Sequence, residues 1–335
     1  MVSIVEVAAA AGVSATTVSH TLSGNRFVSP QVQVRVRRAM SELGYVPRRA
    51  AQTLASGKSR LIALIVPDIS NSYFAELARG VEEAAIAAEY NVVLCTTGFD
   101  HAREVLYLET VQSRAVDGII YAAGSPPTTS ELVGLLGDLP HVLVDEDIPG
   151  ATAPTVVSDN VQGGRLAAEH LIALGHGEAL VITASGLESA AQRHQGFLEV
   201  WTASGRPEPR VLDGHFSFEG ARAALSGRIG LFAPDRVSSV FAVNDLMALG
   251  AIQELASAGI NVPAGVSVVG FDDSPSARHS VPQLTSVRQD VVALGVTATN
   301  ALTEALEEGI PAPAGRRVLP VELIARDSSA SPLPH

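Results

Sequence analysis

Apolar residues recur at helical spacing at the very start of the chain. Ser3 precedes this stretch and Glu6 follows three residues later, which matches a capping box at the start of a helix. Gly12 ends the pattern, because glycine adopts positive φ without steric cost. The residues that form the inner face of this predicted helix are Ile4, Val7, Ala8 and Ala11.

A second short helix is predicted directly after a tight turn at Gly12 and Val13. Ser14 caps this helix, and Val18 and Leu22 form its inner face. Its outer face carries small or polar side chains, which a recognition helix needs in order to read base edges in the major groove. The pattern therefore predicts a helix-turn-helix that binds DNA. The outer residues are Ala15, Thr16, Ser19 and His20.

A third helix is predicted to begin at Pro30, since proline is tolerated in the first helical turn, and to end at Gly44. Pro47 then breaks the chain, and residues 48–56 form a short basic linker with one exposed leucine, Leu54. This linker is too short to be a stable isolated helix, so we expect it to fold only when docked. The predicted core side of the third helix consists of Val32, Val36, Met40 and Leu43.

From residue 61 onward, short apolar runs alternate with stretches of helical length. Short apolar strands separated by crossover helices are typical of parallel, doubly wound sheets. About nine such strands are more than one compact sheet holds. Two lobes are expected, which meet near residues 157–160 and again near 284–290. The predicted fold class is an all-α three-helix headpiece followed by a two-lobed α/β core. Strands are expected over residues 61–66, 92–96, 118–122, 141–145, 179–183, 211–213, 239–243 and 266–271, and helices over 73–90 and 188–204.

Polar and aromatic side chains follow most of these strands. Ligands of open parallel sheets bind outside the carboxyl ends of the strands, so we expect these side chains to converge on one cleft. Carboxylates, amides and a guanidinium pair with vicinal hydroxyl groups, and aromatic rings cover the apolar face of a sugar. The candidates are Asp68, Asn71, Tyr73, Phe74, Asp145, Arg193, Phe216, Phe218, Asn244, Asp245, Asp272 and Asp273.

Each candidate also has a purely structural interpretation. An Asp or Asn after a strand is often a helix N-cap, which applies to Asp245 and Asp273. Phe74 is equally compatible with a place in the core. Arg193, taken alone, is typical of a solvated surface residue. The functional interpretation therefore depends on convergence of the whole set.

The charge is divided unevenly along the chain of 335 residues, which has a net charge of −12. Residues 1–60 hold eight basic and two acidic side chains, a net charge of +6, and the remainder has a net charge of −18. Attraction to phosphates is thus confined to the N-terminal part. The single cysteine, Cys95, excludes a disulfide framework and is expected to be a buried small residue. With no signal peptide and no long apolar run, a cytoplasmic protein is expected.

Motifs of enzymes are missing from the sequence: it has no G-x-S-x-G, no H-E-x-x-H, and neither of the two glycine-rich nucleotide-binding motifs. His170 and His176 make a poor metal pair. We therefore expect no catalytic residues, no cofactor and no metal.

The chain resembles the lactose-repressor (LacI/GalR) family of bacterial transcription regulators over nearly its whole length. The resemblance rests on segments that occur in the family's order, namely I-V-E-V-A-A-A-A-G-V-S-A-T-T-V-S, E-L-G-Y-V-P, L-I-A-L-I-V-P-D-I-S-N-S-Y-F, E-H-L-I-A-L-G-H, F-A-V-N-D-L-M-A-L-G-A, V-P-A-G-V-S-V-V-G-F-D-D and L-T-S-V-R-Q. It implies a core like that of periplasmic binding proteins.

The resemblance also implies roles in DNA binding. Backbone-positioning contacts match Ser14, Thr17 and Ser19, whereas base-reading positions match Ala15, Thr16 and His20. His20 departs from the arginine that is usual in the family, so the half-site is expected to differ from the family's common operator. In the linker, Ala51 and Leu54 match the hinge helix, whose paired leucines wedge into the minor groove.

Effector positions follow from the same resemblance. Acidic residues beside Arg193 favour a neutral sugar over a phosphorylated one, and Tyr73, Phe74 and Phe216 keep a nucleobase open as an alternative. The C-terminal segment has no leucine heptads, so a homodimer on a pseudo-palindromic operator is expected. The matching effector positions are Asn71, Phe74, Asp145, Arg193, Phe216, Asn244 and Asp272.

Three functions are compatible with this interpretation. The first is a repressor that a sugar releases from its operator; the second is a co-repressor-type regulator that responds to a nucleobase or another metabolite; the third is a solute-binding protein. The expected domains are a DNA-binding domain (residues 1–46), a hinge (47–59) and a core (60–330). The core divides into an N-lobe (60–158 and 290–318) and a C-lobe (159–289 and 319–329).

Overall fold

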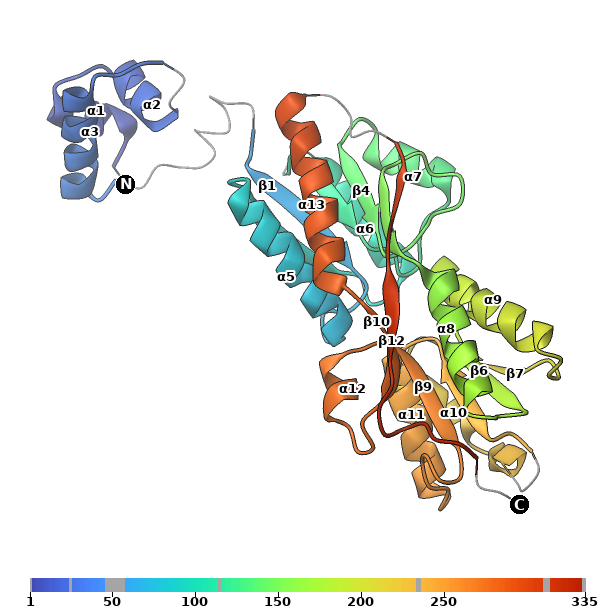
Figure 1. Cartoon of the computed structure of the whole chain (residues 1–335). Helices are drawn as coiled ribbons and strands as arrows, with labels where there is room; N and C mark the ends of the chain where they lie inside the picture. The colour runs from blue at the N-terminus through green and yellow to red at the C-terminus, as the bar shows by residue number, and fades with distance from the viewer. Residues whose placement is uncertain are drawn as a thin grey trace. The chain divides into compact units, whose positions relative to one another are not determined.

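The chain forms two compact units in the computed structural model (Figure 1). The first unit ends at Leu61 and also includes Asp117, and the second contains the rest of the chain. The predicted hinge residues Ala51 and Leu54 lie outside the described residues. The structure describes residues 2–23, 26–45, 58–113, 116–232, 236–309 and 314–332.

We call the described residues of the first unit up to residue 45 the headpiece. Three helices make up this headpiece. Val7, Val18 and Val36 come from different helices. All three are fully buried in the same apolar cluster, so one small core holds the three helices together. The helices are α1 (Ile4–Ala11), α2 (Ala15–Ser23) and α3 (Pro30–Leu43).

Local caps set the helix-turn-helix geometry. Ser3 Oγ accepts a hydrogen bond from Glu6 N at 3.3 Å, and the Glu6 carboxylate accepts one from Ser3 N at 2.7 Å. Gly12 ends α1 with a φ of 63°, in the left-handed region. Ser14 Oγ then accepts a hydrogen bond from Thr17 N at 3.1 Å at the start of α2. The predicted capping box, turn and second cap are therefore confirmed.

The predicted core side of α3 is wrong at one position. Leu43 is 37% exposed, whereas Ala39, about one turn earlier, is buried in the headpiece core. The helix ends at Gly44, which has a φ of 64°, so Leu43 lies on the last turn at the edge of this small core.

Two six-stranded sheets form the second unit, and each has the strand order of a doubly wound fold. The pairs inside the sheets are parallel, as in β1 with β3 and β8 with β9, whereas β12 joins β10 in the antiparallel direction. The first sheet, in the order β11-β5-β4-β3-β1-β2, contains β1 (Leu61–Val66), β2 (Asn91–Thr96), β3 (Gly118–Tyr121), β4 (His141–Val144), β5 (Thr155–Ser158) and β11 (Arg316–Leu319). The second, in the order β12-β10-β9-β8-β6-β7, contains β6 (Ala179–Thr183), β7 (Arg210–Asp213), β8 (Ser239–Ala242), β9 (Ser267–Asp272), β10 (Thr285–Gln289) and β12 (Val321–Ile324).

Each sheet and the helices packed on it form a lobe; we call the lobe with β1 the N-lobe and the lobe with β6 the C-lobe. The chain passes from one to the other after β5, after β10 and between β11 and β12. The N-lobe helices are α5 (Ser72–Ala87), α6 (His101–Gln112), α7 (Thr129–Leu136) and α13 (Val291–Glu308). The C-lobe helices are α8 (Asn160–Ala173), α9 (Glu188–Ala203), α10 (Phe218–Leu225), α11 (Asp245–Ser257), α12 (Pro275–His279) and a short 3₁₀ helix (Ile229–Phe232).

Glycines let two helix pairs approach closely. In the C-lobe, a Cβ at Gly196 of α9 would overlap the carbonyl oxygen of Val161 in α8. In the N-lobe, a Cβ at Gly295 of α13 would lie 2.5 Å from the Leu77 carbonyl oxygen of α5. These contacts fix how the helices stack, and Figure 1 shows both pairs lying side by side. Lobe cores are therefore closed by backbone-to-backbone packing as well as by apolar side chains.

The predicted number of strands is too low. β5, β10, β11 and β12 are short, and each carries polar residues, so none stands out as an apolar run. The apolar run that contains Cys95 also differs from a buried strand. Cys95 itself is buried, as predicted, but Val93 and Leu94 are about two-fifths exposed because β2 lies at the edge of its sheet.

Candidate functional site

The surface of α2 carries the residues predicted to contact DNA. Thr16 is exposed, and Ser19 and His20 are half-buried. The hydroxyl groups of Ser14 and Thr17 lie 2.9 Å apart at the start of the helix. Ala15 packs partly against the headpiece core, so only part of it is available for contact. This face offers hydrogen-bonding groups without bulky side chains, which suits insertion into a groove.

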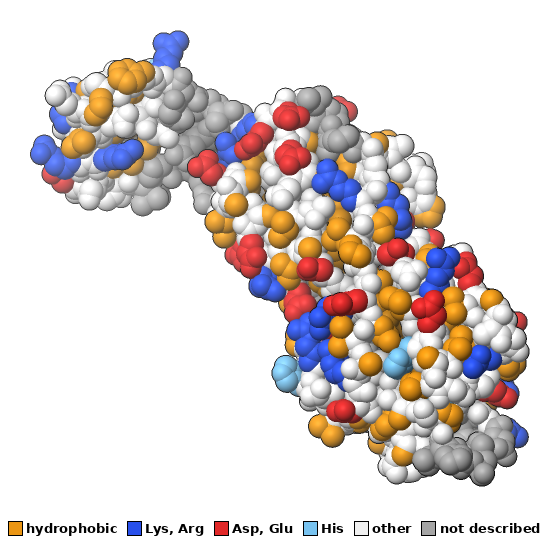
Figure 2. All heavy atoms as spheres, in the orientation of Figure 1, with side chains coloured by type: hydrophobic (Ala, Val, Ile, Leu, Met, Phe, Trp, Pro, Cys, Tyr) orange, Lys and Arg blue, Asp and Glu red, His pale blue; other side chains and the backbone are white. Residues whose placement is uncertain are grey.

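The headpiece also carries exposed basic side chains on α3. Arg35, Arg37 and Arg38 of α3 are all exposed. Figure 2 shows Lys and Arg side chains on the surface of the headpiece and many Asp and Glu side chains on the second unit. The headpiece can therefore attract phosphates while the second unit repels them.

Arg193 lies at the centre of the predicted effector site, in the second turn of α9. It is 2% exposed, so the alternative of a solvated surface residue is wrong. Its Nε donates to Asn160 Oδ1 at 2.8 Å, and its Nη1 donates to the Val243 carbonyl oxygen at 2.8 Å. The guanidinium also stacks 3.9 Å from the centre of the Phe271 ring. Within the described chain Nη2 donates no hydrogen bond, so this donor is available to a ligand.

Asp272 faces Arg193 at the end of β9. Its Oδ1 lies 3.7 Å from Arg193 Nη1 and accepts a hydrogen bond from Gln289 Nε2 at 2.7 Å. Burial raises the pKa of the Asp272 carboxyl well above its ordinary value, and the Arg193 charge opposes this rise. The backbone φ of 119° lies in a region that L-residues rarely adopt, so the surrounding structure holds this residue in a strained conformation.

Tyr73 and Asp145 form a second polar pair, contributed by the N-lobe. The Tyr73 hydroxyl donates to Asp145 Oδ1 at 2.5 Å. Burial raises the pKa of the Tyr73 phenol, and the neighbouring Asp145 and Asp272 charges act in the same direction. Burial likewise raises the pKa of Asp145, against the Arg193 charge. These four side chains thus share one electrostatic environment, as their convergence at the strand ends predicted.

The two predicted asparagines serve as helix caps. Asn71 Oδ1 accepts a hydrogen bond from Tyr73 N at 3.0 Å at the start of α5, and Asn244 Oδ1 accepts one from Met247 N at 2.8 Å at the start of α11. Asn244 Nδ2 also donates to the Phe216 carbonyl oxygen at 3.4 Å, which connects the loops after β7 and β8. The asparagines therefore shape the site through the backbone.

The aromatic candidates divide between core and surface. Phe74 is buried in the N-lobe core, with its ring centre 5.1 Å from that of Tyr73. Phe216 is half-buried against the C-lobe core and has a φ of 54°, while Phe218 begins α10 and is half-buried. Asp68 caps its own turn by accepting from Ser70 N at 2.8 Å. Among the described rings of the site, Tyr73 alone has a polar partner within it, Asp145.

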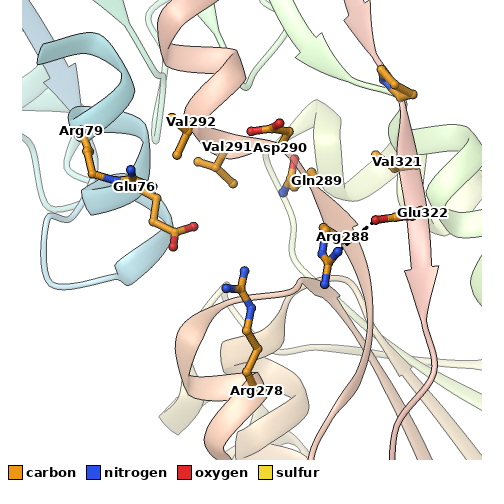
Figure 3. A pocket seen from close by; sticks show the side chains of 11 residues that line it. Glu76, Arg79, Arg278, Arg288, Gln289, Asp290, Val291, Val292, Val321 and Glu322 are labelled. Carbon is orange, nitrogen blue, oxygen red and sulfur yellow. Dashed lines mark hydrogen bonds and ion pairs between the residues drawn. The ribbon is translucent and has the colours of Figure 1, made fainter. Parts of the chain in front are cut away.

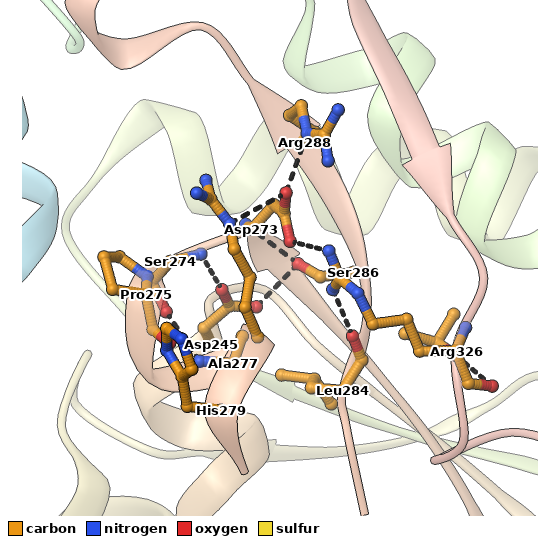
Figure 4. A network of polar contacts seen from close by, with 12 residues as sticks. Asp245, Asp273, Ser274, Pro275, Ala277, His279, Leu284, Ser286, Arg288 and Arg326 are labelled. Atoms are coloured by element: carbon orange, nitrogen blue, oxygen red, sulfur yellow. Dashed lines mark hydrogen bonds and ion pairs between the residues drawn. The ribbon is translucent and has the colours of Figure 1, made fainter.

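Asp245 and Asp273 belong to a separate buried network, and neither is the N-cap that the sequence suggested (Figure 4). The caps are the adjacent Asn244 and Ser274. Burial raises the pKa of Asp245 to about 6, and its carboxylate accepts hydrogen bonds from Ser274 N at 2.7 Å and Ser286 Oγ at 2.6 Å. Asp273 forms ion pairs with three arginines, whose nitrogens lie 2.5 to 3.3 Å from it: Arg278, Arg288 and Arg326.

A cavity of about 570 Å³ lies between the lobes, next to this network (Figure 3). Its walls come from α5, α12 and the segments that cross between the lobes. Arg278 points toward Glu76 across the cavity, and Arg288 is paired with Glu322 at 3.1 Å. Gln289 lines this cavity and also binds Asp272, so the cavity adjoins the predicted effector site without containing its residues.

Two residues that hold the site were not predicted. Asn160 accepts from Arg193, and Gln289 joins the lobes because its Oε1 accepts from Ser158 Oγ at 2.6 Å while its Nε2 donates to Asp272. Gln289 ends a strand, so the rule that found Asp272 would have found it if β10 had been predicted. Asn160 lies two residues after β5, so it too would have been found if β5 had been predicted.

Comparison with protein families matches two parts of the chain. Residues 3–48 match the bacterial regulatory proteins of the lacI family, and residues 168–329 match a periplasmic binding protein-like domain. The transcriptional regulator DegA of Bacillus subtilis, a helix-turn-helix protein, is 33% identical over 98% of both chains. The chain belongs to the LacI family.

Other relatives and solved structures agree with this family. The ribose operon repressor of Haemophilus influenzae is 32% identical over 92% of both chains, and the repressor PurR of Vibrio atlanticus is 31% identical over 92% of this chain and 93% of its own. The structure of the lac repressor dimer bound to operator and the anti-inducer ONPF has a TM-score of 0.85 and 26% identity, over 98% of this chain and 99% of its own.

This LacI-family member is accordingly a DNA-binding transcriptional regulator with an effector-binding core. Its relatives named above are transcriptional regulators. Across the described residues, no helix combines the length and the apolar character needed to span a bilayer.

Proposed function

We propose that this regulator represses transcription as a homodimer on a pseudo-palindromic operator and that a sugar releases it. The observation that carries the sugar assignment is the pair of polar contacts contributed by opposite lobes: Tyr73–Asp145 from the N-lobe and Arg193–Asp272 from the C-lobe. Carboxylates and a guanidinium with an available donor suit the hydroxyl groups of a neutral sugar. Asn71, Phe74, Asn244 and Phe216 complete the proposed site by shaping its walls.

Relatives and neighbours support this effector class. The chain is similar to ribose operon repressors and to a transcriptional regulator, CelR, in complex with cellobiose, with 31% identity and a TM-score of 0.70 over 98% of this chain and all of that one. The similarity to PurR favours a second candidate, a nucleobase that strengthens DNA binding. Tyr73, at the edge of the Phe74 ring, would supply the stacking surface for that ligand.

On the DNA side, we propose that Ser14, Thr17 and Ser19 position the headpiece on phosphates and that Ala15, Thr16 and His20 read bases. Ala51 and Leu54 would form the hinge that inserts into the minor groove. The proposed domains are residues 1–46, 47–59 and 60–330, in a protein that acts in the cytoplasm without a catalytic role. Effector binding would change the relative orientation of the lobes and thereby weaken the hinge.

A titration separates the two candidates. A labelled fragment from the regulator's own promoter region is titrated with the full chain, and fluorescence anisotropy gives the operator affinity without ligand and with each member of a panel of neutral sugars and nucleobases. We expect one sugar to lower operator affinity, and a thermal-shift screen with the same panel identifies it because a bound ligand raises the melting temperature. A nucleobase that raises operator affinity would replace the sugar proposal with the co-repressor one.

A further inference from the structure

Glu146, which follows Asp145 after β4, joins the two lobes. It belongs to the N-lobe and is 3% exposed. Its Oε2 accepts a hydrogen bond from Ser189 N at 3.0 Å, and its Oε1 makes a very short contact with the Ser189 hydroxyl. Ser189 lies in the first turn of α9 in the C-lobe and is buried as well. Both carboxyl oxygens of Glu146, in the N-lobe, therefore contact Ser189, in the C-lobe.

The helix α9 has no cap of its own. Its N-cap residue, Leu187, makes no side-chain hydrogen bond, whereas α5, α8 and α11 have Asn71, Asp159 and Asn244 in this role. The first amide groups of a helix have no acceptor within the helix. Ser189 N is such a group, and Glu146 supplies its acceptor from the opposite lobe. The contact thus replaces a missing N-cap in addition to bridging the lobes.

Polar groups on both lobes surround this contact. Asp147 forms an ion pair with Arg316 at 3.0 Å and accepts from Gln192 of α9 at 3.5 Å. Gln192 also donates to Glu188 at 3.2 Å. Two charged groups act on Glu146 directly: the charge of Asp145 raises its pKa and the charge of Arg193 lowers it. Around them lie Asp147 of the same loop, Glu188 of α9, Arg316 of β11 and Tyr73 of α5, each joined to Asp145, Asp147 or Gln192.

We propose that Glu146 is an interlobe clasp that caps α9 only while the lobes are closed and so acts as a positioning residue for Arg193. Arg193 lies one turn beyond Ser189 on the same helix, and its three buried contacts require α9 to be in register. Opening of the lobes would expose the first turn of α9 and leave Ser189 N without its acceptor. This inference concerns the motion of the lobes, so it does not depend on which effector binds.

The clasp makes closure sensitive to pH. Burial, together with the charge of Asp145, raises the pKa of Glu146 to about 8, although Ser189 and Arg193 oppose the rise. In separated lobes the pKa of the Glu146 carboxyl would return toward its ordinary value of 4.5. A raised pKa in the closed state means that closure takes up a proton. Closure is therefore favoured at low pH, weakens as pH rises from about 4.5 through about 8, and then becomes constant.

Hydrogen exchange of the Ser189 amide in the full chain tests this inference directly, because no intrahelical acceptor protects that amide. Glu146→Ala removes the acceptor and should raise the intrinsic-rate-corrected exchange at Ser189 about five- to tenfold, the usual effect of losing a cap. Glu146→Gln keeps an amide oxygen for Ser189 N and a donor for the hydroxyl, so protection should remain. Glu109→Gln, at an exposed position of α6, is the control.

The pH profile provides the second readout. In the unmodified chain, corrected protection of Ser189 should fall between pH 5 and about pH 8, whereas in Glu146→Gln it should be flat because the amide does not titrate. If Glu146→Ala does not fold, the pH profiles of Ser189 protection in the unmodified chain and in Glu146→Gln still test the clasp. Equal exchange in Glu146→Ala and the unmodified chain, or the same pH profile in Glu146→Gln, would overturn the clasp.

Discussion

Asp272 combines backbone strain, burial and two polar partners at the end of β9. Strain of this kind persists only where the surroundings hold it, and it is frequent at ligand sites. We expect Asp272→Ala to abolish the response to the effector while operator affinity remains, because the ligand loses a hydrogen-bond acceptor and the headpiece is untouched. Operator anisotropy with and without the effector measures both quantities.

Asp138→Ala removes an exposed carboxylate at a distance along the chain and serves as the matched control for Asp272→Ala. Release of the operator by the effector at unchanged concentration in Asp272→Ala would show that the effector site is elsewhere. Loss of operator affinity in Asp272→Ala, with Asp138→Ala unchanged, would show that Asp272 stabilises the fold rather than binding the effector.

His20 gives a prediction for the reading of DNA. Arginine reaches farther than histidine and donates two parallel hydrogen bonds to guanine. His20→Arg should therefore shift base preference at one position of the half-site toward guanine, with the other positions unchanged. Selection from a randomised operator library reads out all positions at once, and an unchanged preference at every position would mean that His20 does not read a base.

At this scale the sequence indicated some residues and missed others. Asp145, Asp272 and Tyr73 were predicted because each closely follows a buried strand, and the structure places them in one electrostatic group. Arg193 alone gave no sign of burial, since its stabilising contacts come from Asn160 and from the backbone after β8, both distant in sequence. Glu146 was missed because a carboxylate in an acidic loop is typical of the surface.

At the scale of elements, close helix packing gives the sharpest test. Gly196 has no space for a Cβ, because one would overlap the Val161 carbonyl oxygen of α8. Gly196→Ala should force α8 and α9 apart and destabilise the chain by about 2 kcal/mol or more, in the range of overpacked core sites. Chemical denaturation monitored by the fluorescence of Trp201, the single tryptophan, reports this loss because Trp201 lies on α9.

Gly134→Ala is the matched control, since Gly134 lies within α7 and nothing lies within 4 Å of the position of its Cβ. Alanine is the better helix former, so this variant should be neutral or more stable by up to about 1 kcal/mol. A Gly196→Ala variant as stable as Gly134→Ala would mean that α8 and α9 pack less closely than the structure indicates.

Elements with a strong local signal were predicted well. β1 and β6 have the predicted bounds, and α9 ends within one residue of its prediction. α5 ends at Ala87, three residues before the predicted end, because Glu89 turns with a φ of 60°. The four missed strands have four or five residues each and depend on pairing with strands far away in sequence, as β11 does with β5. Such pairing leaves little local pattern.

For the whole molecule, the division of charge determines how DNA binding responds to salt. The first 60 residues carry a net charge of +6 and the rest −18. Each phosphate that a basic side chain neutralises releases counterions and contributes about −0.9 to the slope of log affinity against log salt. The slope should therefore be steep, and it should depend on basic residues among the first 60 alone.

Two arginines separate this expectation from a general effect of charge. Arg26 is exposed just after α2, and Arg317 is exposed on β11. Arg26→Gln should reduce the magnitude of the slope by about 0.9, whereas Arg317→Gln should leave it unchanged although the net charge falls equally. Anisotropy titrations from 50 to about 200 mM salt measure the slope. A slope in Arg26→Gln equal to that of the unmodified chain would mean that phosphate contacts do not involve Arg26. Equal reductions in the two variants would mean that the charge of the whole molecule, not that of its N-terminal part, determines attraction to DNA.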